Sequence, residues 1–430
     1  MSLLKTSLLN GIAVVVRMGT GLVLNKIFAI HVGPQGFAAI GQLQNFIAMV
    51  TTFASGAVNT GVTKYTAEYH DQPQRKEQLF RTAGTLTLAG SLIVGVLLIL
   101  LSSQLNYWLF GDQNYREVLV WLAACLLLIS LNALLLAVLA GQKEVRRYVL
   151  ANIASSLLGL AASGTLAWIF GLRGALIALS LGQALALLAT MFLCRRLDWC
   201  RWSAFVGGVD KDTVRMLGRF VAMALASAML APATQMIIRS DLIATSGTAY
   251  AGYWDAMNKI STMYLTLMTT TLSLYYLPRI SEIRDDGILR KEIWSAFRLI
   301  LPATALFSLV IYLLREPVVG ILFSRDFHPM VQLFGWQMVG DVIKISSWLL
   351  GYVLVGKAMM KLFIVTEVIF SATLYALTYW ATREFGFTGA AMAYALNYAM
   401  YFVAVYIIVI EWRLKRYAAT AENDIGAGLR

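Results

Sequence analysis

The sequence predicts an all-α integral membrane protein, with twelve transmembrane helices in two six-helix bundles related by a parallel pseudo-two-fold repeat. Three observations predict this fold class. Of the 430 residues, 59% are hydrophobic and only 13% are charged, which is about half the charged fraction of a typical soluble protein. Apolar runs of about 20 residues, long enough to cross a bilayer as a helix, recur along the chain. An amino-acid motif in the first half of the sequence also recurs in the second half.

Each apolar run is assigned to a helix, because the strands of a membrane barrel are only about 9–11 residues long and alternate in polarity. A helix also satisfies its own backbone hydrogen bonds within the hydrocarbon core. The predicted spans are 8–30, 37–62, 82–101, 117–139, 149–170, 175–194, 217–238, 249–277, 297–314, 331–355, 362–382 and 389–410.

Basic residues are distributed unevenly between the two sides of these spans. Most of the 35 Lys and Arg residues lie in one set of loops and ends, which the positive-inside rule places in the cytoplasm. Both chain termini are then cytoplasmic, and the protein is a multi-pass membrane protein. The formal net charge of +12 therefore reflects topology and contact with anionic lipid, and we expect no nucleic-acid partner.

Cysteine and histidine usage indicates neither a disulfide framework nor a metal site. Cys125 lies inside a predicted span, whereas Cys194 and Cys200 lie at the cytoplasmic face, where thiols stay reduced. The three His residues are scattered along the chain. The sequence also contains no Gly-rich phosphate loop followed by Lys and Ser or Thr. We therefore expect no metal, no organic cofactor and no ATP site.

An internal repeat relates the two halves of the sequence. The stretch FGLRGALIALSL (170–181) matches FGFTGAAMAYAL (385–396) at several Gly, Ala, Phe and Leu positions, with an offset of 215 residues in a chain of 430. Gly141 and Gly356, each just after a span, share this offset. Six spans per half is an even number, so both halves insert with the same orientation. In transporters, such halves flank a central substrate site.

The repeat and the loop pattern together predict the domain boundaries. The polar loop between the halves is the longest cytoplasmic connection and is interpreted as a linker. The predicted parts are an N-terminal six-helix bundle at 1–200, a linker at 201–216, a C-terminal six-helix bundle at 217–412 and a cytoplasmic tail at 413–430.

Several predicted spans carry charged residues. A charge at the bilayer centre costs about 2.5–3.5 kcal/mol on insertion scales, so it must face water or a partner. One interpretation is structural, since Asp–Lys spacings of three or four residues permit pairing on one helix face. The charged residues inside spans are the bases Arg17, Lys26, Lys259 and Lys344 and the acids Asp255, Asp341 and Glu367.

The balance of these charges favours a second interpretation, a water-filled and net cationic cavity between the bundles. Neither Arg17 nor Lys26 has an acid in its own span, although Lys26 can extend towards the periplasm. Arg239 is expected to add to the periplasmic rim, offset by Asp241. A cationic cavity suits an anionic cargo, since guanidinium groups match the geometry of phosphate and Lys adds a compact charge.

Polar and acidic residues in the spans supply further candidates. Asn45, Asn59 and Asn258 are candidates to line the cavity and bind hydroxyl groups, although hydrogen bonding between helices is the commoner use of such residues. The acids Asp255, Asp341 and Glu367 are candidates to bind a coupling ion, either a proton or sodium, and to release a basic partner.

Three stretches resemble the Wzx-type flippases for lipid-linked oligosaccharides, and the resemblance extends over essentially the whole chain. These flippases form the polysaccharide transporter branch of the multidrug/oligosaccharidyl-lipid/polysaccharide exporter superfamily. Within the family, the resemblance is greatest to the members that serve enterobacterial common antigen. The stretches are DFHPMVQLFGWQMVGDVIKISSWLLGYVLVGKAMMKLFIVTE (326–367), NTGVTKYTAEYHDQPQ (59–74) and LSLYYLPRISEI (272–283).

This resemblance implies a fold and an activity. The fold is two six-helix bundles in a V shape like that of the multidrug and toxic-compound antiporters. The activity is transfer of an undecaprenyl-pyrophosphate-linked oligosaccharide, here the trisaccharide lipid III, from the cytoplasmic to the periplasmic leaflet of the bacterial inner membrane by alternating access. Inner-membrane lipids, a polysaccharide polymerase and a chain-length regulator are the implied partners. An O-antigen repeat unit is the alternative cargo.

Two other classes of function remain as alternatives. A drug or cation antiporter of the same fold needs an acidic cavity for its cationic cargo, which the excess of buried bases disfavours. A membrane oligosaccharide polymerase or ligase needs a sizeable periplasmic platform for its catalytic residues. The longest periplasmic loops here, 102–116 and 315–330, are short, so we expect a transporter rather than an enzyme.

Overall fold

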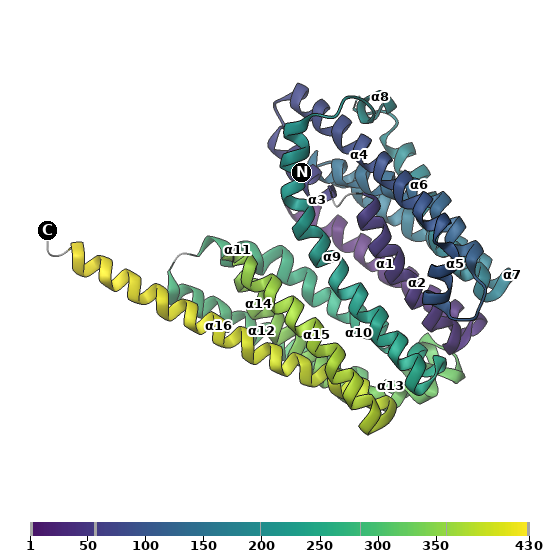
Figure 1. Cartoon of the computed structure of the whole chain (residues 1–430). Helices are drawn as coiled ribbons and strands as arrows, with labels where there is room; N and C mark the ends of the chain where they lie inside the picture. Colours follow the sequence, from purple (N-terminus) through teal and green to yellow (C-terminus); the bar gives the residue numbers. More distant parts are fainter. Residues whose placement is uncertain (1–2, 56–57, 198, 284, 358, 428–430) are drawn as a thin grey trace. The chain divides into compact units, whose positions relative to one another are not determined.

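The computed structural model describes residues 3–427 except 56–57, 198, 284 and 358, and these residues form helices without strands (Figure 1). Residues 428–430 of the predicted tail lie outside the described part. The chain divides into two compact units. Unit 1 comprises Met1–Met236 and Ile321–Asp326, and unit 2 comprises Ile237–Gly320 and Phe327–Arg430.

The first half of the chain contains five long helices, one of which has two limbs. Short helices α3, α5 and α8 connect or flank them. The elements are α1 (Leu3–His31), α2 (Gly33–Ala54), α3 (Asn59–Glu68), α4 (Pro73–Leu100), α5 (Ser102–Phe110), α6 (Arg116–Gly141), α7 (Val145–Cys194) and α8 (Trp202–Phe205).

The second half repeats this order with small irregular turns between the long helices. The elements are α9 (Lys211–Ser246), α10 (Thr248–Thr271), the π-helix η1 (Leu272–Tyr276), α11 (Leu277–Glu282), α12 (Asp286–Leu313), α13 (Arg315–Leu322), the 3₁₀-helix η2 (Arg325–Leu333), α14 (Phe334–Gly356), α15 (Met360–Phe385), the 3₁₀-helix η3 (Gly386–Thr388) and α16 (Gly389–Ala427).

The long helices agree with the predicted spans. Within the described residues, eight helical stretches are long and apolar enough to cross a membrane. Two of them, Val145–Cys194 and Met360–Glu411, have 50 and 52 residues, more than twice the roughly 20 residues that one crossing needs. Each of these two accounts for a pair of predicted spans. With the less apolar helices α9 and α10, the arrangement is consistent with twelve spans.

Matching glycines break the helix at the same place in both halves. Gly171 interrupts α7 at φ 57° and ψ −136°, and Gly386 ends α15 at φ 63° and ψ −150°. Residues with a Cβ avoid this backbone region, whereas Gly adopts it readily. The predicted gaps between spans 149–170 and 175–194, and between 362–382 and 389–410, are therefore both made by glycine.

The turns that follow are packed in the same way. A Cβ atom added to Gly174 would lie 1.9 Å from the carbonyl oxygen of Leu166, and one added to Gly389 would lie 2.1 Å from that of Ala381. Leu166 and Ala381 are themselves one repeat apart in the sequence. Equivalent backbone contacts in the two halves thus confirm the internal repeat that the matching residues predicted.

The predicted linker is an ordered part of unit 1. The ring of Phe205 is buried and stacks on Phe80 of α4 with centroids 5.8 Å apart. A Cβ atom on Gly84 would lie 2.0 Å from the carbonyl oxygen of Phe205, so α4 and the linker are in direct backbone contact. The chain passes from unit 1 to unit 2 further along, between Met236 and Ile237 of α9.

Candidate functional site

Unit 1 has an open cavity of about 450 Å³ between α1, α2, α6 and α7, in which polar side chains lie within a largely apolar lining. Arg17 lines it from α1, and its guanidinium group donates a hydrogen bond to Asn152 Oδ1 of α7 at 3.3 Å. Asn132 lines it from α6 and accepts a hydrogen bond from the Thr190 hydroxyl at 2.7 Å. Among the described residues that line this cavity, Arg17 is the one with a formal charge.

Small residues let the two limbs of α7 pack closely at the wall of this cavity. A Cβ atom on Gly182 would lie 3.1 Å from the Cα atom of Gly159, so the two limbs of α7 approach closely there. Both glycines line the cavity. Arg17 and Thr20 are three residues apart and therefore lie on the same face of α1. The result is a single cation with amide and hydroxyl groups among apolar side chains, and these polar groups suit an anion that carries hydroxyls.

A second hollow of about 450 Å³ continues from the first, since Thr51, Leu179 and Gln183 line both. Asn59 lines its far end. The oxygens Asn59 Oδ1 and Thr51 Oγ1 are buried and have no hydrogen-bond partner within the described residues. A buried polar atom without a partner costs about 1–3 kcal/mol, so both oxygens are available to a polar ligand or to water.

Unit 2 contains a buried ion pair between neighbouring helices. Arg239 of α9 donates two hydrogen bonds to the Asp255 carboxylate of α10, with both nitrogen–oxygen distances at 2.6 Å. Lys259, one turn further along α10, lies near enough for its charge to act on Asp255. The expected offset of Arg239 by Asp241 is wrong, because Asp241 accepts hydrogen bonds from Arg383 at 3.1 and 3.2 Å instead.

A second buried acid in unit 2 is held by tyrosines. The Tyr264 hydroxyl donates to Asp341 Oδ2 and the Tyr394 hydroxyl donates to Asp341 Oδ1, each at 2.6 Å. The Asp341 side chain is fully buried. Gln337, one turn earlier on α14, donates to the hydroxyl of Ser261 at 3.1 Å. The carboxylate thus joins α10, α14 and α16, and its main partners are hydroxyl groups rather than Lys344.

Lys344 rests on aromatic rings. Its ammonium nitrogen lies 5.1 Å from the ring centroid of Trp348, 5.4 Å from that of Tyr394 and 5.0 Å from that of Tyr398. Such cation–π contacts stabilise an ammonium group without neutralising it. Glu367 of α15 is half-buried, and the charge of Lys344 acts on it.

The remaining predicted residues lie in separate places. Lys26 donates to the carbonyl oxygen of Phe323, just beyond the end of α13, where helix carbonyls lack internal partners. Asn45 of α2 donates to Gln235 of α9 at 3.2 Å, which is the interhelical use weighed above. Asn258 of α10 has a buried amide nitrogen without a partner in the described part of the chain.

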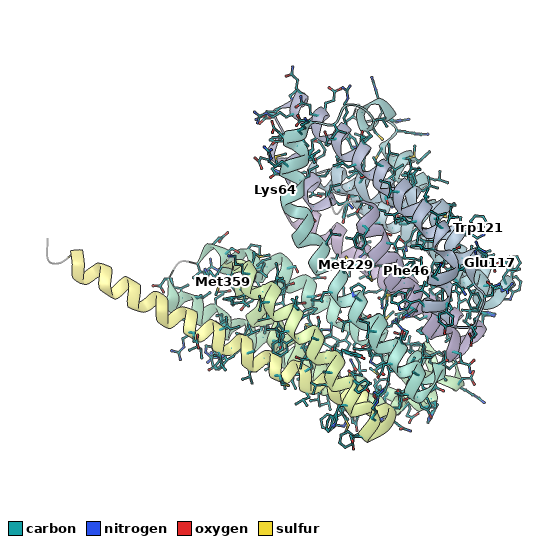
Figure 2. All side chains as sticks on the ribbon, viewed as in Figure 1. Phe46, Lys64, Glu117, Trp121, Met229 and Met359 are labelled. Carbon is teal, nitrogen blue, oxygen red and sulfur yellow. The ribbon has the colours of Figure 1, made fainter. Side chains whose placement is uncertain are left out.

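The candidate residues therefore fall into distinct clusters. Figure 2 shows the side chains of the described residues as sticks along the helices of each unit. Spacing within one span did not reveal Tyr264 and Tyr394, because both bond Asp341 from other helices. Asn152 and Gln183 were also missed as cavity residues. Their signal is weak, since a lone amide in an apolar run is usually a contact between helices.

Comparison with known sequences places the chain among proteins of polysaccharide synthesis. Residues 3–284 match the family described as "Polysaccharide biosynthesis protein". Two curated relatives, both named lipid III flippase, come from Escherichia coli strain K12 and Shigella flexneri. Each is 30% identical to this chain over 413 residues, which cover 96% of this chain and 99% of the relative.

Comparison with solved structures shows the fold. An inward-facing multidrug resistance transporter of the MATE family, in the MOP superfamily, has a TM-score of 0.76 and 14% identity, with 95% of this chain and 99% of that chain covered. A MOP-superfamily transporter from Pyrococcus furiosus, described as having a binding pocket of reverse polarity, has a TM-score of 0.61 and 14% identity, with 94% and 95% covered. The all-helical transporter fold predicted from the sequence is thereby confirmed.

Proposed function

Because the chain belongs to the polysaccharide biosynthesis protein family, we propose that it is a flippase for an undecaprenyl-pyrophosphate-linked oligosaccharide. The observation that carries this proposal is the nearly full-length similarity to two lipid III flippases. Their name makes lipid III, the trisaccharide of enterobacterial common antigen, the first candidate cargo. Transfer would run from the cytoplasmic to the periplasmic leaflet of the inner membrane, with both termini in the cytoplasm.

Arg17 and its cavity are the proposed binding site for the polar part of the cargo. The guanidinium group can donate parallel hydrogen bonds to a diphosphate, and its present partner is a neutral amide at a long 3.3 Å. The amides and hydroxyls further along, including Thr51, Asn59 and Gln183, suit the hydroxyl groups of sugars. A cavity of this composition fits an anionic, hydroxyl-rich cargo better than a cationic drug.

The other predicted bases receive different roles in this proposal. Lys344 is a second candidate for contact with the diphosphate, because aromatic rings hold its charge in place without cancelling it. Arg239 and Lys259 surround Asp255 and stabilise unit 2. Lys26 holds the chain segment that contains Phe323. The partners that each side chain has in the structure support these proposed roles.

Asp341 is the proposed coupling residue. As a carboxylate it accepts two hydroxyl hydrogen bonds, and on protonation its own proton competes with one of them. Binding of a proton or sodium would therefore change the contacts between α10, α14 and α16. Alternating access, the usual mechanism of transporters built from repeated halves, would use this change to favour one conformation.

Reconstitution tests the proposed function directly. The purified full-length chain is placed in vesicles that contain lipid III with a labelled sugar, and exposure of the label to a membrane-impermeant enzyme is followed in time. We expect exposure of the initially protected pool at a rate that protein-free vesicles do not show. Equal rates with and without protein, or efflux of cationic drugs in place of lipid transfer, would exclude the proposal and favour an antiporter.

A further inference from the structure

Unit 2 has an apolar groove beside the first half of α12, which we name the Arg290 groove. It has a volume of about 360 Å³ and lies among α12, α14 and α16. Arg290, which is exposed, lies at one end of it. The walls are largely aromatic, with Trp294 and Phe297 from α12 and Phe402 and Tyr406 from α16. The rings of Phe402 and Tyr406 are stacked, with centroids 6.1 Å apart.

A second apolar groove, which we name the Tyr312 groove, lies beside the other end of α12. It has a volume of about 510 Å³ and is lined by α12 and α14, including Leu309, Tyr312, Trp336 and Val339. Arg315 lies at this end. Its guanidinium carbon is 4.4 Å from the ring centroid of Tyr312, and it donates to the Tyr312 carbonyl oxygen at 2.9 Å. Each groove therefore has an arginine beside its outer end.

The two grooves follow one face of α12. At 3.6 residues per turn, positions 290, 297, 308 and 312 lie within about 60° of one another around the helix axis. The 28 residues of α12 rise about 42 Å, close to the 40–45 Å thickness of a bilayer with its headgroups. If α12 crosses the bilayer along this length, its two ends place the arginines near opposite headgroup levels and one groove in each leaflet.

We propose that this face of α12 is the path for the polyprenyl tail of the cargo, and this inference rests on the proposed function. The tail occupies the Arg290 groove before transfer and the Tyr312 groove after it. Arg290 and Arg315 contact the diphosphate at the two membrane surfaces. The tail stays in contact with lipid throughout the transfer and needs no polar cavity.

Two properties favour a polyprenyl diphosphate over an ordinary phospholipid as the occupant. A phospholipid stays in its leaflet, whereas paired grooves on one helix face suit a lipid that changes leaflet. A diphosphate also offers more acceptor oxygens for a guanidinium group than a phosphodiester does. The apolar and aromatic walls match an unsaturated hydrocarbon chain.

Photo-cross-linking tests the proposal on the full-length protein in vesicles. The probe is undecaprenyl diphosphate with a diazirine in its tail, and adducts are mapped by mass spectrometry. We expect adducts on α12 and α16 at the Arg290 groove and on α12 and α14 at the Tyr312 groove. Unlabelled undecaprenyl diphosphate should compete, and phosphatidylglycerol should not.

A matched pair of variants tests the role of the arginine. Arg290→Gln should reduce labelling of the Arg290 groove roughly threefold, which is the effect of losing one exposed charge contact. Lys291→Gln removes an exposed charge at the same depth, outside both grooves, and should leave labelling unchanged.

Three results would overturn the tail path. The first is that phosphatidylglycerol competes as well as undecaprenyl diphosphate does. The second is that Arg290→Gln and Lys291→Gln reduce labelling equally. The third is that adducts form only on other helices while the wild-type protein still transfers lipid. The last result leaves the flippase function standing. Absence of transfer by the wild-type protein would instead contradict the proposed function.

Discussion

Arg239 and Asp255 form a bidentate ion pair between α9 and α10 inside unit 2. Their side chains are only 1% and 6% exposed, so each charge depends on the other for solvation. Removal of one partner leaves an uncompensated buried charge, which costs about 3–5 kcal/mol. The pair is therefore assigned to the stability of unit 2 rather than to the cargo.

The first prediction concerns this pair. Asp255→Asn should lower the free energy of unfolding by about 3–5 kcal/mol, and Arg239→Met should have a smaller effect because Lys259 still acts on Asp255. The losses of the two single variants should not add in the double variant, because both substitutions remove the same ion pair. Thermal unfolding in detergent measures all three. Additive losses in the double variant would show that the two residues do not act as a pair.

The second prediction concerns Asp341 and its tyrosines. Asp341→Leu should cost about 1–3 kcal/mol, mainly at Tyr394, whose hydroxyl loses its acceptor, whereas the Tyr264 hydroxyl keeps Ser308 at 3.1 Å. Asp341→Asn keeps one acceptor oxygen and should retain the fold. If Asp341 is the coupling residue, this Asn variant transfers lipid at a rate that no longer responds to an imposed proton or sodium gradient.

Vesicles with and without each gradient provide the measurement. Tyr394→Phe serves as the control, because it removes one hydrogen bond and leaves the carboxylate able to titrate. A gradient response of Asp341→Asn equal to that of the wild type would assign coupling elsewhere, with Glu367 as the next candidate.

The third prediction concerns the repeated glycines. Gly171→Ala and Gly386→Ala place a Cβ in a positive-φ backbone region that is essentially restricted to glycine, which costs about 1–3 kcal/mol. Gly174→Ala and Gly389→Ala should cost more, because the new carbon meets a backbone carbonyl oxygen at about 2 Å. The yield of folded protein and the melting temperature in detergent measure the effects.

A helical glycine with free space supplies the control for that series. Gly19 has no atom within 4 Å of an added Cβ, and Gly19→Ala should be neutral or stabilising by up to about 1 kcal/mol. If the variants of one half were tolerated and those of the other half were not, the two turns would not be equivalent.

The fold was largely predictable because the bilayer imposes strong rules on sequence. The length of each apolar run located the spans, and the distribution of Lys and Arg between the loops predicted the orientation that we propose. The repeat also marked the helix breaks, because only glycine provides the backbone geometry found at Gly171 and Gly386. α9 and α10 show the limit of hydropathy, since functional and structural polar residues lower the apolar signal of a span.

The site was less predictable, because its contacts join residues far apart in the sequence. Spacing suggested that Asp341 pairs with Lys344, yet Tyr264 and Tyr394 are 77 and 53 residues away from it. Arg239 was expected at the rim and is instead buried against Asp255. Lys26 donates a hydrogen bond to a main-chain carbonyl oxygen, and the pattern of side chains in a sequence cannot predict such a partner.

Arg17 is the central residue of the proposed site, because it is the charged residue among those described around the unit 1 cavity. Its hydrogen-bond partner is a neutral amide, Asn152, at a long distance of 3.3 Å. Arg17→Lys keeps the charge and Arg17→Gln removes it, and neither change disturbs an ion pair among the described residues. Both variants are compared with the wild type at equal protein levels in vesicles that contain lipid III.

The most direct measurement is the initial rate of lipid III transfer by these three proteins. The account predicts a rate for Arg17→Gln at least roughly tenfold below wild type, since a charged hydrogen bond contributes about 1.5–3 kcal/mol, and an intermediate rate for Arg17→Lys. A wild-type rate in Arg17→Gln would contradict the claim that this guanidinium group binds the diphosphate.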